Sequence, residues 1–168
     1  MAATNSFDVS TGCDLQEVDN AVNQALKEIG QRYDFKGSKC EIDFDRPKSE
    51  IRLLADDDFR MDALVDVLRT RLIKRGVPVK NLKFGDREPA ANSAMRSTVS
   101  LTQGIPADTA RRIVKSIKDN KVFRKVTASI QGDEVRVASP SRDELQAVMG
   151  ALRAEDFGVE LQFGNYRS

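Results

Sequence analysis

The chain has 168 residues, 40% of them hydrophobic and 32% charged, and its formal net charge is +1. This balance is typical of a folded chain and excludes a disordered one, while the near-neutral total does not by itself indicate an acidic partner. No window approaches the roughly eighteen apolar residues of a spanning helix, and the first residues lack a signal-peptide pattern, so we expect a cytoplasmic protein without a membrane partner.

The first half of the chain predicts alternating strands and helices. Asp14 is placed to cap the N-terminus of one helix, and Gly76 is placed to end another. The apolar stripe expected for the helix after Asp14 is Leu15, Val18, Val22, Ala25, Leu26 and Ile29. Alternating apolar and acidic side chains over 40–44 predict a half-buried strand. The expected elements are, in order, a strand over 6–11, the helix capped by Asp14, paired strands over 40–44 and 50–54, the helix that ends at Gly76, and a strand over 82–84.

The second half repeats the first. Glu50-Ile-Arg-Leu53 recurs as Glu134-Val-Arg-Val137, and Leu82-Lys-Phe-Gly85 recurs as Leu161-Gln-Phe-Gly164. Such self-similarity indicates two copies of one structural unit. The expected elements of the second copy are a strand through Val99 and Leu101, a helix that buries Ala110, Ile113, Val114 and Ile117, a hairpin of 126–130 and 135–137, a helix that buries Leu145, Val148, Met149 and Leu152, and a strand through Leu161 and Phe163.

Two copies of the order β-α-β-β-α-β predict an α+β fold. The order is that of the ferredoxin-like unit, a four-stranded antiparallel sheet with two helices on one face, so the chain is predicted to be a tandem duplication of two ferredoxin-like domains. The second face of each sheet is expected to be polar and open. We predict the first repeat over 1–88, a linker over 89–94 and the second repeat over 95–168.

The sequence does not point to an enzyme. It contains no histidine, so no Ser-His-Asp triad, Cys-His pair or histidine-ligated metal is available, and neither Gly-rich phosphate-binding motif is present. Asp56-Asp57-Asp58 would suit a magnesium ion, but the start of a helix, where negative charge offsets the dipole, is the favoured interpretation. We expect no catalysis, no metal and no cofactor, and a hydrolase that uses this cluster is the least favoured alternative.

The most distinctive charged segment lies between Arg111 and Lys125, where seven basic residues are opposed by Asp119 alone. Arg111, Lys115 and Lys118 are spaced to share one face of a helix. Such a face is either an ordinary solvated surface or a surface that binds phosphates. Binding of RNA or DNA through this basic helix is therefore the alternative function.

Readout of RNA bases on the sheets is not expected. The ferredoxin-like unit is also the shape of the RNA-recognition motif, which stacks bases on aromatic residues of its two central strands. The matching strands here, 50–54 and 134–138, carry no aromatic residue. Tyr33, Phe35 and Tyr166 lie at the ends of elements, and an aromatic residue at a helix-to-strand corner is more often part of a core.

Motifs along nearly the whole chain resemble one known family. They are Ser6-Phe-Asp-Val9, Asp14-Leu-Gln-Glu-Val-Asp-Asn-Ala21, Arg32-Tyr-Asp-Phe-Lys-Gly37, Leu72-Ile-Lys-Arg-Gly76, Gln103-Gly-Ile105, Gln131-Gly-Asp-Glu-Val-Arg-Val137, Ser141-Arg-Asp-Glu-Leu-Gln-Ala-Val148 and Phe163-Gly-Asn-Tyr-Arg167. Together they resemble the YajQ family of bacterial proteins. The resemblance implies domains that exchange their N-terminal strands, so that the strand over 6–11 completes the second domain and the strand over 96–103 completes the first.

The resemblance also implies a function. It implies a cytosolic nucleotide-binding protein without established enzymatic activity, and some relatives resemble effectors of cyclic di-GMP that act on a protein or DNA partner. We therefore expect a regulatory protein that binds cyclic di-GMP, GTP or ATP, with a nucleic acid or a protein as a further partner. The candidate nucleotide contacts, chosen for charge and exposure, are Arg32, Phe35, Arg52, Lys115, Lys118, Arg136, Arg142 and Arg167.

Two of these candidates form a pair. Arg52 and Arg136 occupy equivalent outward positions in the two repeats. A two-fold ligand with two phosphates would suit this pair if the two sheets face one another.

Overall fold

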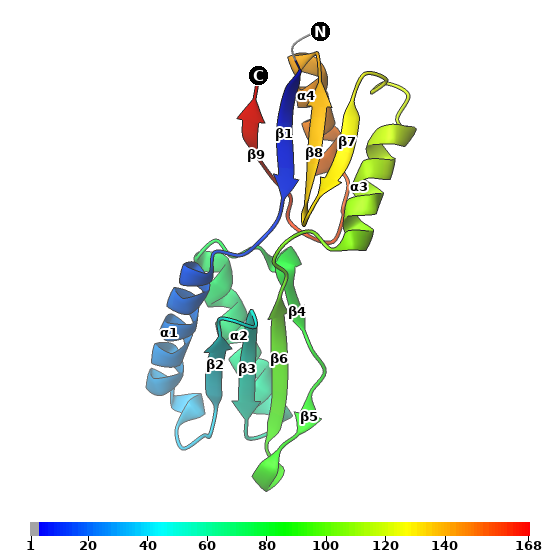
Figure 1. Cartoon of the computed structure of the whole chain (residues 1–168). Coiled ribbons are helices and arrows are strands. Elements are labelled where there is room, and N and C mark those ends of the chain that lie inside the picture. Colours follow the sequence, from blue (N-terminus) through cyan, green and yellow to red (C-terminus); the bar gives the residue numbers. More distant parts are fainter. Residues whose placement is uncertain (1–3) are drawn as a thin grey trace. The chain divides into compact units, whose positions relative to one another are not determined.

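The computed structural model describes residues 4–168, which form two compact units. The middle unit comprises residues 13–103, and the N/C unit comprises residues 4–12 together with 104–168 (Figure 1). Among the described residues, none of the helices is both long and apolar enough to cross a lipid bilayer. The two cysteines, Cys13 and Cys40, are free thiols.

The middle unit consists of one antiparallel sheet with two helices packed against it. Strands β2, β3, β6 and β4 lie in that order, all neighbours are antiparallel, and β5 pairs with β6. Two helices supply the apolar residues that cover the sheet, and the core lies between them and the strands. The elements are α1 (Leu15–Gln31), β2 (Glu41–Asp45), β3 (Glu50–Ala55), α2 (Asp58–Lys74), β4 (Leu82–Phe84), β5 (Glu88–Pro89), β6 (Met95–Leu101) and the 3-10 turns Tyr33–Phe35, Val79–Asn81 and Ala91–Ser93.

The N/C unit has the same architecture with four strands. Its sheet order is β7-β8-β1-β9, again antiparallel throughout, so β9 is an edge strand. A second core lies between this sheet and its two helices. The elements are β1 (Asn5–Ser10), α3 (Ala107–Asp119), β7 (Thr127–Gln131), β8 (Glu134–Ser139), α4 (Arg142–Ala154) and β9 (Gln162–Arg167).

The topology confirms the predicted fold class and the exchange of N-terminal strands. β1 lies between β8 and β9 in the N/C unit, and β6 lies between β3 and β4 in the middle unit. The exchanged strands are buried at the centre of each sheet, because Phe7, Val9 and Val99 are all 0% exposed. The segment 89–94 therefore joins β5 to β6 inside the middle unit, and the chain passes between the units at residues 12–13 and 103–104.

Local sequence signals explain most element boundaries. Asp14 caps α1, because its side chain accepts hydrogen bonds from the backbone N–H groups of Gln16 and Glu17, as predicted. The predicted apolar stripe of α1 was wrong at Leu26, which is 40% exposed. In the last strand, pairing with β1 continues to Arg167, which places Tyr166 inside β9.

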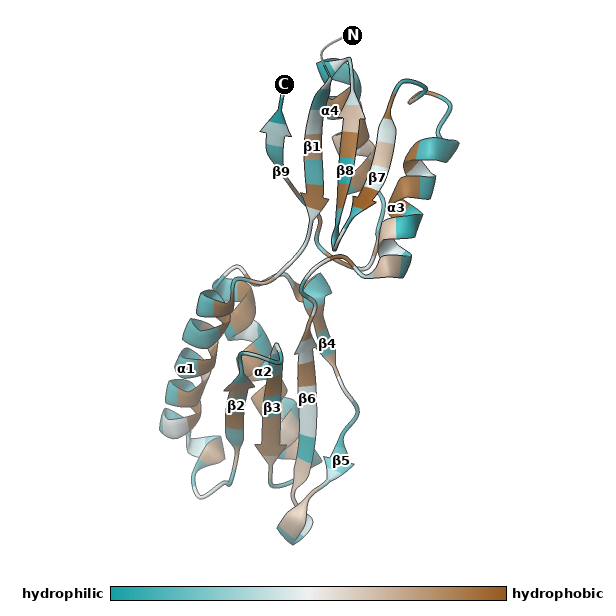
Figure 2. Ribbon diagram, viewed as in Figure 1, coloured by the Kyte–Doolittle hydropathy of each residue, from teal (hydrophilic) through white to brown (hydrophobic). Residues whose placement is uncertain are grey.

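The hydropathy of the helices matches their position over the sheets. Along α1 and α3, hydrophilic residues alternate with hydrophobic ones (Figure 2), as expected for helices that bury one face. Outward positions of the strands, such as Arg52, Thr98 and Arg136, alternate with buried ones. Each sheet therefore keeps one polar face open, and polar side chains on that face are available for binding.

Candidate functional site

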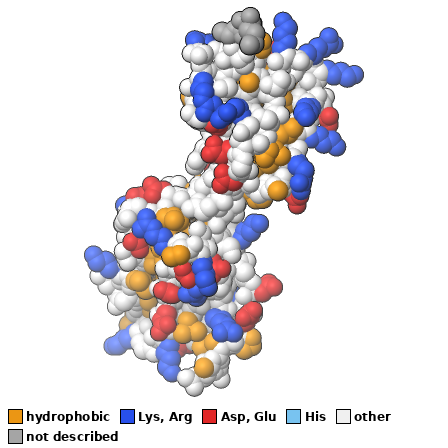
Figure 3. Space-filling view, viewed as in Figure 1, with side chains coloured by type: hydrophobic (Ala, Val, Ile, Leu, Met, Phe, Trp, Pro, Cys, Tyr) orange, Lys and Arg blue, Asp and Glu red, His pale blue; other side chains and the backbone are white. Residues whose placement is uncertain are grey.

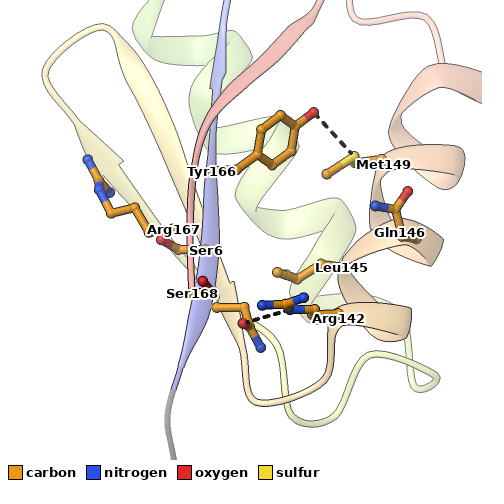
Figure 4. Close-up of a pocket in the computed structure, with 9 residues that line it drawn as sticks. Ser6, Arg142, Leu145, Gln146, Met149, Tyr166, Arg167 and Ser168 are labelled. Atoms are coloured by element: carbon orange, nitrogen blue, oxygen red, sulfur yellow. Dashed lines mark hydrogen bonds between the residues drawn. The ribbon is translucent and has the colours of Figure 1, made fainter.

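A pocket in the N/C unit lies between α4 and the ends of β1 and β9 (Figure 4). Its volume is about 320 Å³, near the lower end of the range typical of small-molecule sites. The lining residues come from segments far apart in the sequence, because β1 contributes from the start of the chain and β9 from its end. They are Asn5, Ser6, Arg142, Leu145, Gln146, Met149, Tyr166, Arg167 and Ser168.

Arg142 is the first residue of α4 and is held at the pocket. The Ser141 side chain caps the helix by accepting from the Glu144 backbone N–H at 3.2 Å. Arg142 Nε donates to Asn5 Oδ1 at 3.3 Å, and the Asn5 amide donates to the Pro140 carbonyl at 3.2 Å. This arrangement leaves the terminal guanidinium nitrogens at the N-terminus of α4. The helix dipole there favours an anion, and the first-turn carboxylates of Asp143 and Glu144 offset part of its charge.

Tyr166 supplies an aromatic ring at the same pocket. Its side chain is 62% exposed, and its hydroxyl donates to the Phe163 carbonyl at 3.4 Å and lies 4.0 Å from Met149 Sδ. Leu145 and Met149 are buried and form the apolar part of the lining. The ring is therefore held in place with much of its surface still available for stacking.

Gln146 completes the polar part of the pocket. It lies one helical turn after Arg142 on α4, so both side chains are on the same helix face, and it is exposed. In Figure 4 its amide group lies near Met149 on the same side of β1 and β9 as Tyr166. An amide presents both donors and an acceptor, which is the chemistry needed to recognise the edge of a base.

Arg167 lines the pocket but points its guanidinium elsewhere. Figure 4 shows the side chains of Arg167 and Ser6 on the opposite side of β1 and β9 from Tyr166. There Arg167 Nη2 lies 3.7 Å from Asp8 Oδ2, on the open face of the sheet. Consecutive residues of a strand point to opposite faces, so the edge strand presents an aromatic ring on one side and a cation on the other.

Asp8 organises the polar groups on that open face. Arg136 Nε donates to Asp8 Oδ1 at 3.1 Å, and the Asn165 amide donates to Asp8 Oδ2 at 2.6 Å. Burial raises the pKa of the Asp8 carboxyl, but the hydrogen bonds from Asn165 and Arg136 and the charges of Arg136 and Arg167 outweigh this effect. The pKa of Asp8 is therefore below its usual value, and the carboxylate is ionised at neutral pH.

Three of the predicted site residues therefore lie at two places in the N/C unit, the pocket and the open face of the sheet. Arg142 lies at the pocket, and Arg136 and Arg167 meet at Asp8. Asp8, Gln146 and Asn165 were not among the predicted contacts, and Tyr166 was recognised only as an aromatic at the end of an element. The alternation of side chains along β9 is the sequence signal that could have assigned Tyr166 to the opposite face of the sheet from Arg167.

Three predicted contacts belong to the middle unit and are already engaged there. The guanidinium of Arg32 forms two hydrogen bonds with Asp34, at 3.0 and 2.6 Å, and lies 5.3 Å from the centre of the Phe35 ring. Phe35 is only 5% exposed and packs in the core, which leaves no free ring face for a ligand. Arg52 pairs with Asp45 at 2.6 Å and with Asp43 at 3.2 Å.

The remaining predicted contacts, Lys115 and Lys118, lie on α3. Within residues 4–168, neither forms a salt bridge, and the same holds for Lys121, Arg124 and Lys125. Lys and Arg side chains gather over α3 and the loop after it (Figure 3). This surface, defined by the five residues just named, is the basic α3 surface.

The acidic cluster Asp56–Asp58 has structural roles, and the prediction that it begins a helix is confirmed. Asp57 caps α2 by accepting from the Arg60 N–H at 2.8 Å, and Asp56 accepts from the Lys39 N–H at 2.7 Å. Asp58 lies in the first turn and pairs with Arg87. Among the described residues, no group of acidic or cysteine side chains is arranged to hold a metal ion.

Comparison with known proteins identifies the family. The family described as nucleotide-binding protein YajQ-like matches residues 5–167. The chain belongs to this YajQ-like family. Its relatives include a "Nucleotide-binding protein" of Desulforamulus reducens, 49% identical over 100% of this chain and 99% of the relative, and one of Chloroherpeton thalassium, 46% identical over 99% and 100%. The resemblance inferred from the sequence motifs is therefore confirmed.

A third YajQ-like relative has the same coverage. The "Nucleotide-binding protein Acid345_2028" of Koribacter versatilis is 46% identical over 99% of both chains. All three relatives span both units, so the exchanged strands and the pocket at α4 lie within the matched region.

Proposed function

We propose that this YajQ-like protein binds a nucleotide at the pocket between α4 and β9. One observation carries the proposal: the exposed ring of Tyr166 and the guanidinium of Arg142 line the same pocket. A nucleotide joins a flat aromatic base to an anionic phosphate, so it needs these two kinds of group at one site. The names of the relatives, which call them nucleotide-binding proteins, support the same ligand class.

Each part of the pocket has a role in this proposal. Tyr166 stacks on the base, a contact worth about 1–3 kcal/mol. Gln146 recognises the edge of the base through its amide, and Leu145 and Met149 exclude water beneath it. Arg142 and the N-terminus of α4 bind the phosphate, because a guanidinium and unpaired backbone N–H groups both favour an anion there.

We further propose cyclic di-GMP as the ligand and a regulatory, non-catalytic role in the cytoplasm. The resemblance of the sequence motifs to cyclic di-GMP effectors supports this choice. The cavity of about 320 Å³ suits a single nucleotide moiety, so the second half of a cyclic dinucleotide would lie outside it, near the edge strand β9.

Calorimetric titration with cyclic di-GMP, GTP and ATP at two salt concentrations tests the proposal. Tyr166→Leu should weaken binding by about 5- to 150-fold because stacking is lost, whereas Tyr166→Phe should retain it. Tyr33→Leu is the matched control, since Tyr33 is an exposed tyrosine of the middle unit, 87% exposed. Equal affinity of the wild type and Tyr166→Leu for all three nucleotides would refute the proposed site.

The basic α3 surface supports a second candidate function, binding of RNA or DNA. Its five cations form no salt bridge among the described residues, so their charge is not neutralised locally. Phosphate contacts of this kind weaken steeply with salt, unlike a small-nucleotide pocket. A short single-stranded RNA that binds at low salt and is released at high salt would support this function.

A further inference from the structure

The open face of the N/C sheet carries two arginines that share one carboxylate. Asp8 lies on the central strand β1, and Arg136 and Arg167 come from its two neighbours, β8 and β9. Their guanidinium nitrogens lie 3.1 and 3.7 Å from the two oxygens of Asp8. Both cations are therefore gathered around one point of the sheet.

Asp8 holds these arginines without using up their donors. Asp8 is only 7% exposed, whereas the side chains of Arg136 and Arg167 are 40% and 43% exposed. A guanidinium has five N–H donors. Within the described residues only Nε of Arg136 forms a hydrogen bond with Asp8, while Nη2 of Arg167 lies 3.7 Å from it, an ion pair without a hydrogen bond. The other donors of the two side chains form no hydrogen bond with another described residue, so they are available to a ligand.

The charges of this cluster do not cancel. Two guanidinium groups face one carboxylate, and Asn165, which also donates to Asp8, is neutral. The cluster therefore has a net charge of +1. An anion that approaches it meets positive charge and preoriented donors together, so less conformational entropy is lost on binding.

The equivalent position in the middle unit is different. Arg52 lies at the corresponding place on β3, but it is surrounded by three carboxylates, those of Asp45, Asp43 and Glu50 at 2.6, 3.2 and 4.0 Å. An anion at Arg52 would meet net negative charge. The cationic cluster is therefore a property of the N/C sheet and not a general consequence of the repeated fold.

We propose that Arg136 and Arg167 form a second anion site, which binds a phosphate group on the open face of the N/C sheet. The guanidinium fork matches the geometry of phosphate oxygens and binds them bidentately. This site is separate from the pocket, because Arg167 and Tyr166 point to opposite sides of β9 (Figure 4). It does not depend on the proposed function of the pocket.

The phosphate can come from two sources that share this chemistry. One is the terminal phosphate chain of a free nucleotide, and the other is the internal phosphodiester of a linked nucleotide. Inorganic triphosphate represents the first source, and a thymidine dinucleotide without terminal phosphates represents the second. Titration of the full chain with each probe distinguishes them.

The decisive variant is Arg136→Gln, tested for binding of both probes by calorimetry at low salt. We expect it to bind the preferred probe at least about tenfold more weakly than the wild type, because a charge-assisted contact is removed. Arg167→Gln should show the same direction of change and does not disturb the 3.1 Å hydrogen bond between Arg136 and Asp8. The matched control is Arg96→Gln, which removes an exposed arginine from the sheet of the middle unit.

The outcomes separate this site from the pocket. Arg142→Gln, which removes the phosphate contact proposed for the pocket, should weaken triphosphate binding much less than Arg136→Gln does. Preference for triphosphate identifies terminal phosphates as the ligand, and preference for the dinucleotide identifies a phosphodiester. The proposal is overturned if neither probe binds the wild type, or if Arg136→Gln and Arg167→Gln bind both probes as tightly as Arg96→Gln does.

Discussion

Asp8 and Arg136 lie directly opposite each other on neighbouring antiparallel strands, and Arg136 Nε donates to Asp8 Oδ1 at 3.1 Å. They are 128 residues apart in the sequence. Their contact joins the first strand of the chain to the second strand of the late hairpin. Because Asp8 is nearly buried, this pair contributes both to the stability of the sheet and to the orientation of its open face.

Replacing Asp8 by Asn should destabilise the protein by about 1–3 kcal/mol at pH 7, because charge-assisted hydrogen bonds to a buried carboxylate are lost. The free energy of unfolding from urea titration measures this effect. Ser6→Ala, on the same strand and the same face, is the control and should change stability little.

The effect of Asp8 should also depend on pH. The pKa of Asp8 is lowered in the folded protein from its ordinary value of 3.8, so the unfolded chain takes up the proton first as the pH falls. The stabilisation is fully present above about pH 4 and is lost as the pH falls through the folded pKa. The difference in unfolding free energy between the wild type and Asp8→Asn should therefore narrow below pH 4. A difference that stays constant down to pH 2 would contradict the assigned network.

Arg142→Gln should weaken nucleotide binding by about tenfold, because the phosphate loses a charge-assisted contact. The loss should be smaller at high salt, where the charge is screened. Arg153→Gln is the matched control, since Arg153 lies on the same helix but covers the Phe163 ring at 4.8 Å and does not line the pocket. Calorimetry with the preferred nucleotide provides the measurement, and equal losses in both variants would argue against a specific role for Arg142.

Gly104→Ala should destabilise the protein by about 3 kcal/mol. Gly104 has φ +79°, and a Cβ there would lie 2.8 Å from Cβ and Cγ of Asp133. Left-handed backbone conformation costs a non-Gly residue about 1–2 kcal/mol, and the clash adds to this cost. Gly132→Ala is the control, because Gly132 has φ +62° but open space around its Cα, so it should lose only the backbone part. Unfolding in urea compares the two, and equal losses would contradict the clash.

Charge removal on the basic α3 surface separates the two candidate functions. The double variant Lys115→Gln, Lys118→Gln should make the fall of RNA affinity with rising salt concentration less steep. The change in slope should correspond to the loss of about two phosphate contacts. Binding of a free nucleotide at the pocket should remain unchanged. RNA binding that keeps its full salt slope in this variant would place the RNA elsewhere.

Much of the fold follows from local sequence patterns. The Asp14 cap, the alternation over 40–44 and the repeated strand motifs each predicted an element that the structure contains. The error at Leu26 arises because this residue lies at the edge of the apolar face of α1. The packing of neighbouring elements, and not the sequence pattern, decides whether such an edge residue is covered.

The surroundings of the candidate binding residues were less predictable than the elements. Charge and exposure selected Arg136, Arg142 and Arg167, which the structure places at the pocket or beside Asp8. The same criterion selected Arg52, although its neighbours are acidic. Exposure of a charged residue can be inferred from periodicity, but the sign of the charges around it depends on the strands that lie beside it.

The sequence by itself determined the two repeats and the order of their main helices and strands. Only the tertiary structure decided which charges remain available. Arg52 on β3 lies beside Asp43 of its own hairpin, whereas Arg136 on β8 lies beside Ser129 of its hairpin and Asp8 of the exchanged strand. Attraction between exposed charges is largely screened beyond about 8–10 Å in salt solution, so the nearest charges set the binding properties of a repeated position. At Arg52 these are three carboxylates of its own hairpin, whereas at Arg136 they are one carboxylate of the exchanged strand and the second cation, Arg167.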